Sequence, residues 1–192
     1  MRKTKAVLAC LVAFTLAVPG CYESLTDIAT PDKLVFYEDV VGDYKAIDPA
    51  TGRITIEKGK DKSYAYKQYD ANDTLASQGK LWIIKLGEEH FYQITVDGFA
   101  ATDGRTVYGI GRLKMEGKPG ARKLTGYAFK SQETFFGDAT VTTAEYEHMS
   151  GGERKTSRAV SLPADKLQAY LALRAAEMTE PVLKYQQAPS GR

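Results

Sequence analysis

The chain of 192 residues has little cysteine, histidine or tryptophan: two, two and one residues, respectively. Both cysteines, Cys10 and Cys21, lie in the first 21 residues, so the remaining sequence offers no disulfide and no cysteine nucleophile. The two histidines, His90 and His148, lie in separate segments. Glu89 adjoins His90, but neighbouring residues of a strand point to opposite faces of a sheet. We therefore expect no metal site and no cofactor.

The sequence also lacks the motifs that carry common enzyme chemistry. There is no Gly-x-Ser-x-Gly nucleophile elbow. Gly109-Ile110-Gly111 has two glycines of a dinucleotide-binding fingerprint, but the third glycine and the following helix are missing. We interpret these glycines as part of a bent strand that needs small residues. Asp103-Gly104 has no further acidic residues at calcium-ligand spacing and favours a turn. We expect no enzymatic activity and assign no catalytic residue.

Charge is nearly balanced. The full chain carries 26 Lys and Arg and 24 Asp and Glu. Three of the basic residues, Arg2, Lys3 and Lys5, lie in the first 20 residues, which hold no acidic residue. Without that segment the chain has 23 basic and 24 acidic residues, a formal charge of −1. This balance gives no electrostatic reason to expect nucleic acid as a partner.

The N-terminal segment has the pattern of a secretory signal. Its basic residues precede Ala6 to Val18, thirteen residues without a charge. That stretch is shorter than the roughly 20 residues that span a bilayer as a helix. Val18-Pro19-Gly20-Cys21 follows, and it resembles the lipobox of bacterial lipoproteins. The resemblance implies cleavage before Cys21 and acylation of that cysteine, and two or three acyl chains make a stable membrane anchor.

This resemblance makes residues 1–20 a lipoprotein signal peptide and Cys21 the lipid attachment site, with palmitate as a typical acyl group. Pro19 departs from the small or β-branched residue that the family prefers. A second match to the box, ending at Cys10, has too short an apolar region before it. An ordinary secretory signal is the alternative. Because Tyr22 rather than aspartate follows the cysteine, the resemblance favours the outer membrane if the host is Gram-negative.

Beyond the signal, four segments differ in pattern. We interpret residues 21–32 as a polar tether. Residues 33–160 contain strand-like runs separated by turn formers at intervals of about ten residues. Residues 161–180 repeat apolar residues at helical spacing and predict one helix that packs on the β domain. Residues 181–192 show no periodicity and predict a loose tail.

Short connections between the strand-like runs predict antiparallel neighbours. Asp103-Gly104, for example, is typical of a two-residue hairpin. Ile54 and Ile56 alternate with polar residues in GRITIEKG, whereas KLWIIKL is apolar on both faces and predicts the most buried strand. We expect a mainly β fold, an antiparallel meander of six to eight strands curled into a sheet or barrel, with one C-terminal α-helix.

This architecture resembles that of lipocalins and of small lipocalin-like bacterial lipoproteins. Lipocalins carry Gly-x-Trp in the first strand, and Val40-Val41-Gly42-Asp43-Tyr44 opens the predicted sheet in a similar way, with Tyr44 in place of the tryptophan. In that family the tryptophan closes one end of the barrel together with a downstream arginine. The family's Thr-Asp-Tyr motif has no counterpart here. The resemblance implies an internal ligand cavity if the barrel closes.

Tyrosine is plentiful: 12 tyrosines and 7 phenylalanines accompany the single tryptophan. A tyrosine side chain has an apolar body and a polar tip, so it suits a pocket lining as well as an outer sheet face. Core packing and cross-strand pairing are one interpretation of these residues, and a ligand pocket is the other. The candidate ligand-binding residues are the aromatic residues of the strand-like runs: Tyr64, Tyr66, Trp82, Tyr92, Tyr108 and Tyr127.

Together these patterns predict a lipid-anchored, non-enzymatic protein of the cell envelope that binds a small apolar ligand in a lipocalin-like barrel. Such a carrier needs a cavity on the order of a few hundred Å³. The alternative is a structural or assembly lipoprotein with a solid core, which acts through protein–protein contacts. The expected partners are the membrane, through acyl chains on Cys21, and either an apolar ligand or an envelope protein.

Overall fold

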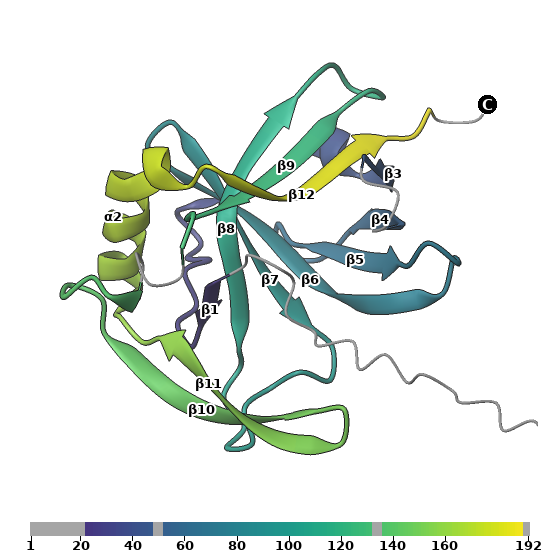
Figure 1. The fold of residues 1–192 in the computed structure, drawn as a ribbon. Coiled ribbons are helices and arrows are strands. Elements are labelled where there is room, and N and C mark those ends of the chain that lie inside the picture. Colours follow the sequence, from purple (N-terminus) through teal and green to yellow (C-terminus); the bar gives the residue numbers. More distant parts are fainter. Residues whose placement is uncertain (1–21, 48–51, 132–135, 190–192) are drawn as a thin grey trace, which may run out of the picture.

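The computed structural model describes residues 22–47, 52–131 and 136–189 (Figure 1). Within them, twelve strands form one sheet. The strands are β1 (Tyr22–Ser24), β2 (Leu34–Val35), β3 (Gly42–Ala46), β4 (Arg53–Lys58), β5 (Tyr64–Tyr69), β6 (Leu75–Leu86), β7 (Glu89–Val96), β8 (Tyr108–Glu116), β9 (Lys123–Ala128), β10 (Thr143–Ser150), β11 (Glu153–Val160) and β12 (Glu180–Gln187). The helical elements are the 3₁₀ helix η1 (Glu38–Val40), the α-helix α2 (Ala164–Arg174) and the 3₁₀ helix η3 (Ala175–Glu177).

Eight of these strands close into an antiparallel barrel. The order around the ring is β8, β7, β6, β5, β4, β3, β12 and β9, and β9 pairs with β8 to complete it. Strands β3 to β9 therefore follow one another in sequence and in space, except that β12 inserts between β9 and β3. The mainly β fold with a barrel and one C-terminal helix is confirmed. Closure pairs both sides of each barrel strand, which removes the open edges of a flat sheet.

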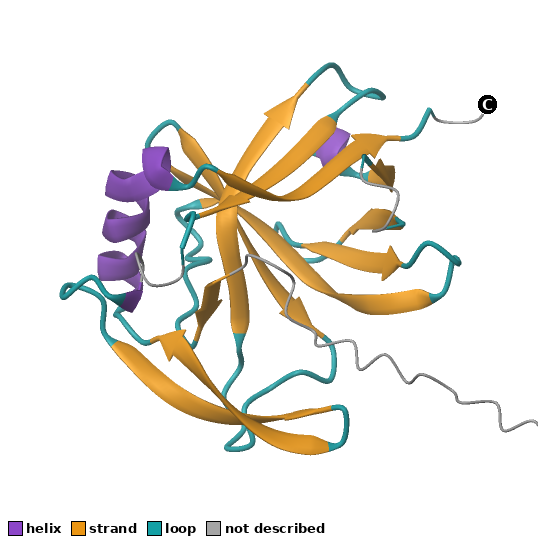
Figure 2. Cartoon of the chain, in the orientation of Figure 1, coloured by secondary structure: helices purple, strands orange, loops and turns teal. Residues whose placement is uncertain are grey.

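Strand β8 is the point at which the sheet branches. Its residues Tyr108 to Ile110 pair with β1, and its residues from Arg112 onward pair with β9. Strand β1 also pairs in parallel with the end of β11, where Ser24 lies opposite Val160. The hairpin of β10 and β11 is thereby attached to the barrel through β1 and extends away from it (Figure 2).

Apolar residues form two main cores, one inside the barrel and one outside it. The inner core contains Val40, Tyr44 and Ile83. The outer core lies between the barrel wall and α2, and it contains Ile84 and Leu167. Ile83 and Ile84 are adjacent on β6 and both are fully buried. The KLWIIKL segment is apolar on both faces because one face points into the barrel and the other is covered by the helix.

Helix α2 packs one apolar stripe on the outside of the barrel. Leu167 and Leu171 are each 1% exposed, whereas Leu173 on the opposite side is 81% exposed. The helical region, α2 with η3, covers 14 residues rather than the predicted 161–180. It begins later because Pro163 is the N-cap residue, with a non-helical ψ of 147°, and it ends earlier because β12 starts at Glu180.

The structure differs from the predicted tether at residues 21–32. Tyr22 begins β1 and is 3% exposed, and Ile28 is fully buried. The Ile28 N–H donates to Gln93 Oε1 (2.8 Å), and Gln168 Nε2 donates to the Ile28 carbonyl (2.9 Å). This segment is fixed between the barrel and α2 because two buried glutamines satisfy its backbone. Cys21 and the predicted signal peptide lie outside the described residues.

The prediction of a loose tail at residues 181–192 is also wrong for most of its length. Residues from Glu180 to Gln187 form β12, which pairs with β9 and β3 and completes the barrel. Leu183 and Tyr185 point inward and alternate with Lys184. The β domain therefore does not end at residue 160: without this last strand the ring would have a gap between β9 and β3.

Candidate functional site

The barrel contains an apolar cavity of about 70 Å³. Its walls come from η1 and from seven of the eight barrel strands, all but β3. The described lining residues are Val40, Ile54, Ile56, Tyr66, Gln68, Leu81, Ile83, Tyr92, Ile94, Leu113, Leu124, Gly126, Leu183 and Tyr185. Nine of them are aliphatic and none of these described residues is charged. The lining is thus built from the inward-facing positions of the alternating strands.

Two glycines leave space on one wall of the barrel. A Cβ atom at Gly111 of β8 would lie 2.4 Å from the Tyr92 hydroxyl oxygen. A Cβ atom at Gly126 of β9 would lie 3.0 Å from the ring carbon Cε1 of Tyr92. The Tyr92 ring therefore rests against a wall without side chains and leaves the middle of the barrel open. This contact explains why Gly111 must be small.

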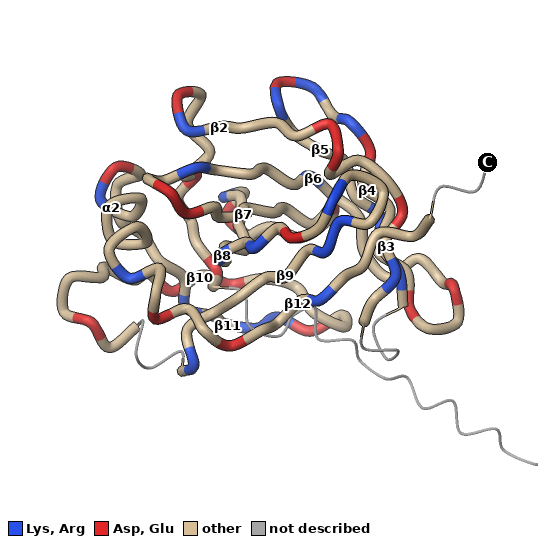
Figure 3. The backbone as a smooth tube through the Cα atoms, turned by 90° about the horizontal axis from the view of Figure 1, so that it is seen from above, with Lys and Arg blue, Asp and Glu red and all other residues tan. Residues whose placement is uncertain are grey.

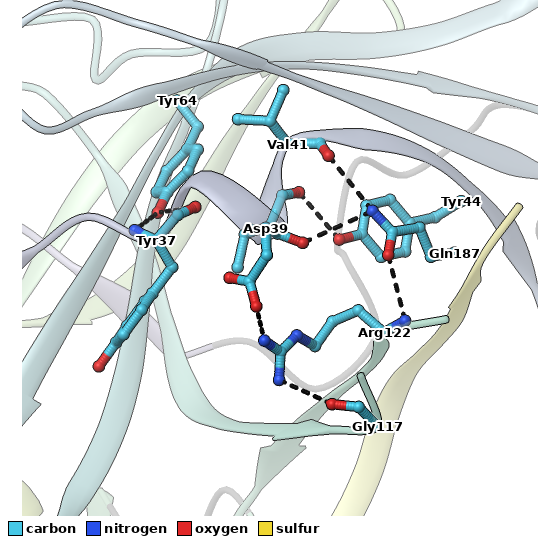
Figure 4. A network of polar contacts seen from close by, with 9 residues as sticks. Tyr37, Asp39, Val41, Tyr44, Tyr64, Gly117, Arg122 and Gln187 are labelled. Atoms are coloured by element: carbon cyan, nitrogen blue, oxygen red, sulfur yellow. Dashed lines mark hydrogen bonds and ion pairs between the residues drawn. The ribbon is translucent and has the colours of Figure 1, made fainter. Parts of the chain in front are cut away.

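The helix η1 covers one end of the barrel. Tyr44 of β3 is fully buried, and its hydroxyl donates to the Val40 carbonyl at 2.9 Å (Figure 4). Burial raises the pKa of Tyr44 well above its usual value, so the hydroxyl stays protonated and continues to donate. Val40 in turn lines the cavity. Tyr44 thus fixes the cover at the position where the lipocalin resemblance implies a tryptophan.

Charged groups meet outside this cover rather than in the cavity. The Arg122 guanidinium forms an ion pair with Asp39 of η1, and it also donates to the Gly117 carbonyl at 3.0 Å (Figure 4). Gln187 connects these groups: its Oε1 accepts from the Arg122 backbone N–H at 3.1 Å, and its Nε2 donates to the Val41 carbonyl at 3.3 Å. The network ties η1 to the start of β9 and the end of β12.

The chain just before η1 is held by aromatic side chains. The Tyr37 backbone N–H donates to the Tyr64 hydroxyl at 2.7 Å, and the Phe36 ring stacks on Tyr64 with centroids 4.8 Å apart. The Tyr37 hydroxyl lies 2.7 Å from His90 Nε2. Burial lowers the pKa of His90, and the nearby Lys85 lowers it further. The end of the barrel is therefore packed with hydrogen-bonded aromatic groups.

The structure separates the predicted ligand-binding residues into two groups. Tyr66 and Tyr92 line the cavity, and Tyr64 is buried beside it in the inner core. Tyr108 and Tyr127 pack on the outer core instead. Trp82 follows Leu81 and precedes Ile83, which both line the cavity, so its side chain lies on the outer face of β6. The predicted lipid attachment site, Cys21, is outside the described residues.

The aliphatic lining and Tyr185 were not among the predicted site residues. The sequence does indicate part of the aliphatic lining, since the alternation in GRITIEKG places Ile54 and Ile56 on the same face of a strand. Alternation within a strand does not say which face is inside a barrel. Tyr185 lay in a segment that was predicted to be a loose tail, and its site role follows only from the pairing of β12 with β9 and β3.

Two features are absent from the part of the chain that the structure describes. No group of three or more histidine, cysteine, aspartate or glutamate side chains in residues 22–47, 52–131 and 136–189 could hold a metal ion. None of the helices in those ranges combines the length and the hydropathy that are needed to cross a membrane.

Comparisons with models of protein families, with curated proteins and with solved structures found no match.

Proposed function

We propose that this chain is a lipid-anchored, non-enzymatic protein of the cell envelope whose barrel binds a small apolar ligand. The observation that carries the proposal is the cavity inside the barrel, which aliphatic side chains line on almost every side. Cavities with a mainly aliphatic lining favour small apolar molecules. The lining residues that the structure describes supply no charged group to activate a substrate, which favours binding over catalysis.

The size of the cavity restricts the ligand. A volume of about 70 Å³ is below the few hundred Å³ expected for a carrier of a whole lipid. Each water-sized group needs roughly 10–15 Å³, so the cavity has room for about five to seven such groups. We therefore propose a small molecule, or the end of a longer chain, as the ligand.

The membrane anchor is the second part of the proposal, and it rests on the lipobox pattern that ends at Cys21. Tyr22, the next residue, is already part of the folded body. An acylated Cys21 would then hold the barrel close to the bilayer surface without an intervening tether. An outer-membrane position in a Gram-negative host follows from the residue after the cysteine and stays a proposal.

Ligand retention tests the binding function. We would purify the full chain from its own host and analyse the retained small molecules by native mass spectrometry. Wild type and Leu173→Phe, which changes the exposed face of α2, should retain the same compound. Ile94→Phe, which fills the cavity, should retain at least about tenfold less. Equal retention by all three, or retention by none, would contradict a ligand in the barrel and favour a protein partner.

Acylation tests the anchor. Cells that express the full chain would be supplied with labelled palmitate. Cys21→Ser should abolish the label, because the resemblance implies the thioether at that residue. Cys10→Ser is the matched control and should leave labelling unchanged. Label on the Cys21→Ser variant would show that the anchor assignment is wrong.

A further inference from the structure

Tyr185 differs from three other tyrosines that are buried inside the barrel. The hydroxyls of Tyr44, Tyr64 and Tyr66 each donate to a backbone carbonyl, those of Val40, Tyr37 and Thr95. Tyr185 is only 5% exposed and lines the cavity. Desolvation alone shifts its pKa, and no hydrogen bond joins its hydroxyl to the described part of the chain. A tyrosine hydroxyl without a protein partner can hydrogen-bond to a molecule that reaches it.

The hydroxyl of Tyr185 is protonated at neutral pH. Burial raises the pKa of Tyr185 to about 12, and no charged neighbour contributes to this change. At neutral pH the group can thus both donate one hydrogen bond and accept others. On β12, Tyr185 lies opposite Leu124 of β9 and Ala46 of β3, which are both apolar.

Charge is absent from the rest of the cavity wall as far as its residues are described. The other uncharged polar side chains among the described lining residues are those of Tyr66, Gln68 and Tyr92. The Tyr66 hydroxyl donates to the Thr95 carbonyl at 3.2 Å, and Gln68 Oε1 accepts from Ser77 Oγ at 3.1 Å. Acidic and basic residues are distributed over the barrel strands (Figure 3), but none belongs to the described lining. A carboxylate or ammonium group that entered this cavity would lose its hydration without gaining a counter-ion. An uncharged ligand loses far less.

We propose that the ligand of the barrel is a neutral molecule with a small apolar body and one oxygen that hydrogen-bonds to the Tyr185 hydroxyl. This inference rests on the proposed binding function and specifies its ligand class: small alcohols, ketones or related neutral compounds, or the neutral end of a longer chain. Carboxylates and amines are excluded by the cost of burying their charge.

Three probes of similar size separate the contributions of shape, hydrogen bonding and charge: benzene, 1-pentanol and pentanoate. Binding is followed by the methyl NMR signals of Ile54 and Ile94, in the full chain with Cys21→Ser so that no acyl chain interferes. Benzene and 1-pentanol should bind. Pentanoate at pH 7 should bind at least about 100-fold more weakly than 1-pentanol, because it is ionised.

The variant Tyr185→Phe removes the hydroxyl and keeps the ring. It should weaken 1-pentanol binding about two- to tenfold, the value of one neutral hydrogen bond, and leave benzene binding within a factor of about two. Tyr22→Phe is the matched control: it removes a hydroxyl that donates to the Phe129 carbonyl in the outer core, and it should not change the ratio of the two affinities. In the wild type, the Tyr185 Cζ signal should shift with 1-pentanol and stay in place with benzene, which tests the contact without a mutation.

The outcomes are distinct. If both probes bind and Tyr185→Phe changes neither affinity or changes both equally, the hydrogen bond is refuted and the apolar binding function stands. Pentanoate binding as strong as that of 1-pentanol would refute the neutral ligand class. If no probe binds the wild type, the proposed binding function itself is refuted.

Discussion

The Tyr92 ring occupies the space that a side chain at Gly111 would need, with only 2.4 Å between the Tyr92 hydroxyl oxygen and an ideal Cβ at that glycine. Tyr92 is 2% exposed and Gly126 lies on its other side, so the ring has little room to move. The barrel is open in the middle because a large residue on β7 is matched to two glycines on β8 and β9.

Gly111→Ala should therefore destabilise the fold by about 1–3 kcal/mol, the usual cost of overpacking a core. The free energy of unfolding in guanidinium chloride measures this effect. Tyr92→Leu combined with Gly111→Ala should cost less than the sum of the two single changes, because the shorter side chain removes the clash. Strictly additive losses would show that the ring and the glycine do not interact.

The N-terminal segment should contribute to stability as a core element does. Ile28→Ala should lower the free energy of unfolding by about 2–5 kcal/mol, because Ile28 is fully buried in the outer core. Ile47→Ala is the control: Ile47 is 47% exposed, and we expect a loss within about 0.5 kcal/mol. A loss at Ile28 as small as that at Ile47 would restore the tether interpretation of this segment.

Stability should fall steeply in alkaline solution. Unfolded tyrosine loses its proton near pH 10, whereas burial raises the pKa of native Tyr185 to about 12. Between these values the unfolded state releases a proton that the native state keeps, so rising pH favours unfolding. The stability that the protonated Tyr185 contributes to the native state is fully present below pH 10 and is lost as the pH approaches 12. It corresponds to roughly 2–3 kcal/mol for this one residue.

The variant Tyr185→Phe isolates that contribution. Its free energy of unfolding, measured by denaturant titration from pH 8 to pH 12, should fall roughly 2–3 kcal/mol less than that of the wild type over the same range. A remaining decrease is expected, because burial also raises the pKa of Tyr64 to about 12. Parallel curves for variant and wild type would contradict the buried state of the Tyr185 hydroxyl.

Much of the barrel could be predicted from local sequence, since alternation and turn residues act over a few positions. Ile54 and Ile56 share an inward face as expected, and both line the cavity. The last strand could not be predicted, because β12 follows a helix and closes the barrel through pairs with residues far away in sequence. Its inward residues, Leu183 and Tyr185, give too short an alternation to stand out beside Pro181.

The residues that line the cavity were harder to predict than the strands, because apolar residues occur on both faces of the barrel wall. Both faces of β6 are apolar, since one faces the cavity and the other faces α2. Aromatic content alone therefore could not separate Tyr92, which lines the cavity, from Trp82 on the outer face. The volume of the cavity depends on how Tyr92 rests on Gly111, which is a long-range fit between strands. No local pattern encodes it.

Xenon binding tests the central claim, a dry apolar cavity in the barrel, most directly. Crystals of the protein would be exposed to xenon gas under pressure, because xenon enters apolar cavities that hold no water. The account predicts xenon density inside the barrel between Ile54, Ile83 and Ile94, and its loss in Ile94→Phe. A barrel filled by ordered water or by side chains, with no xenon in the wild type, would contradict it.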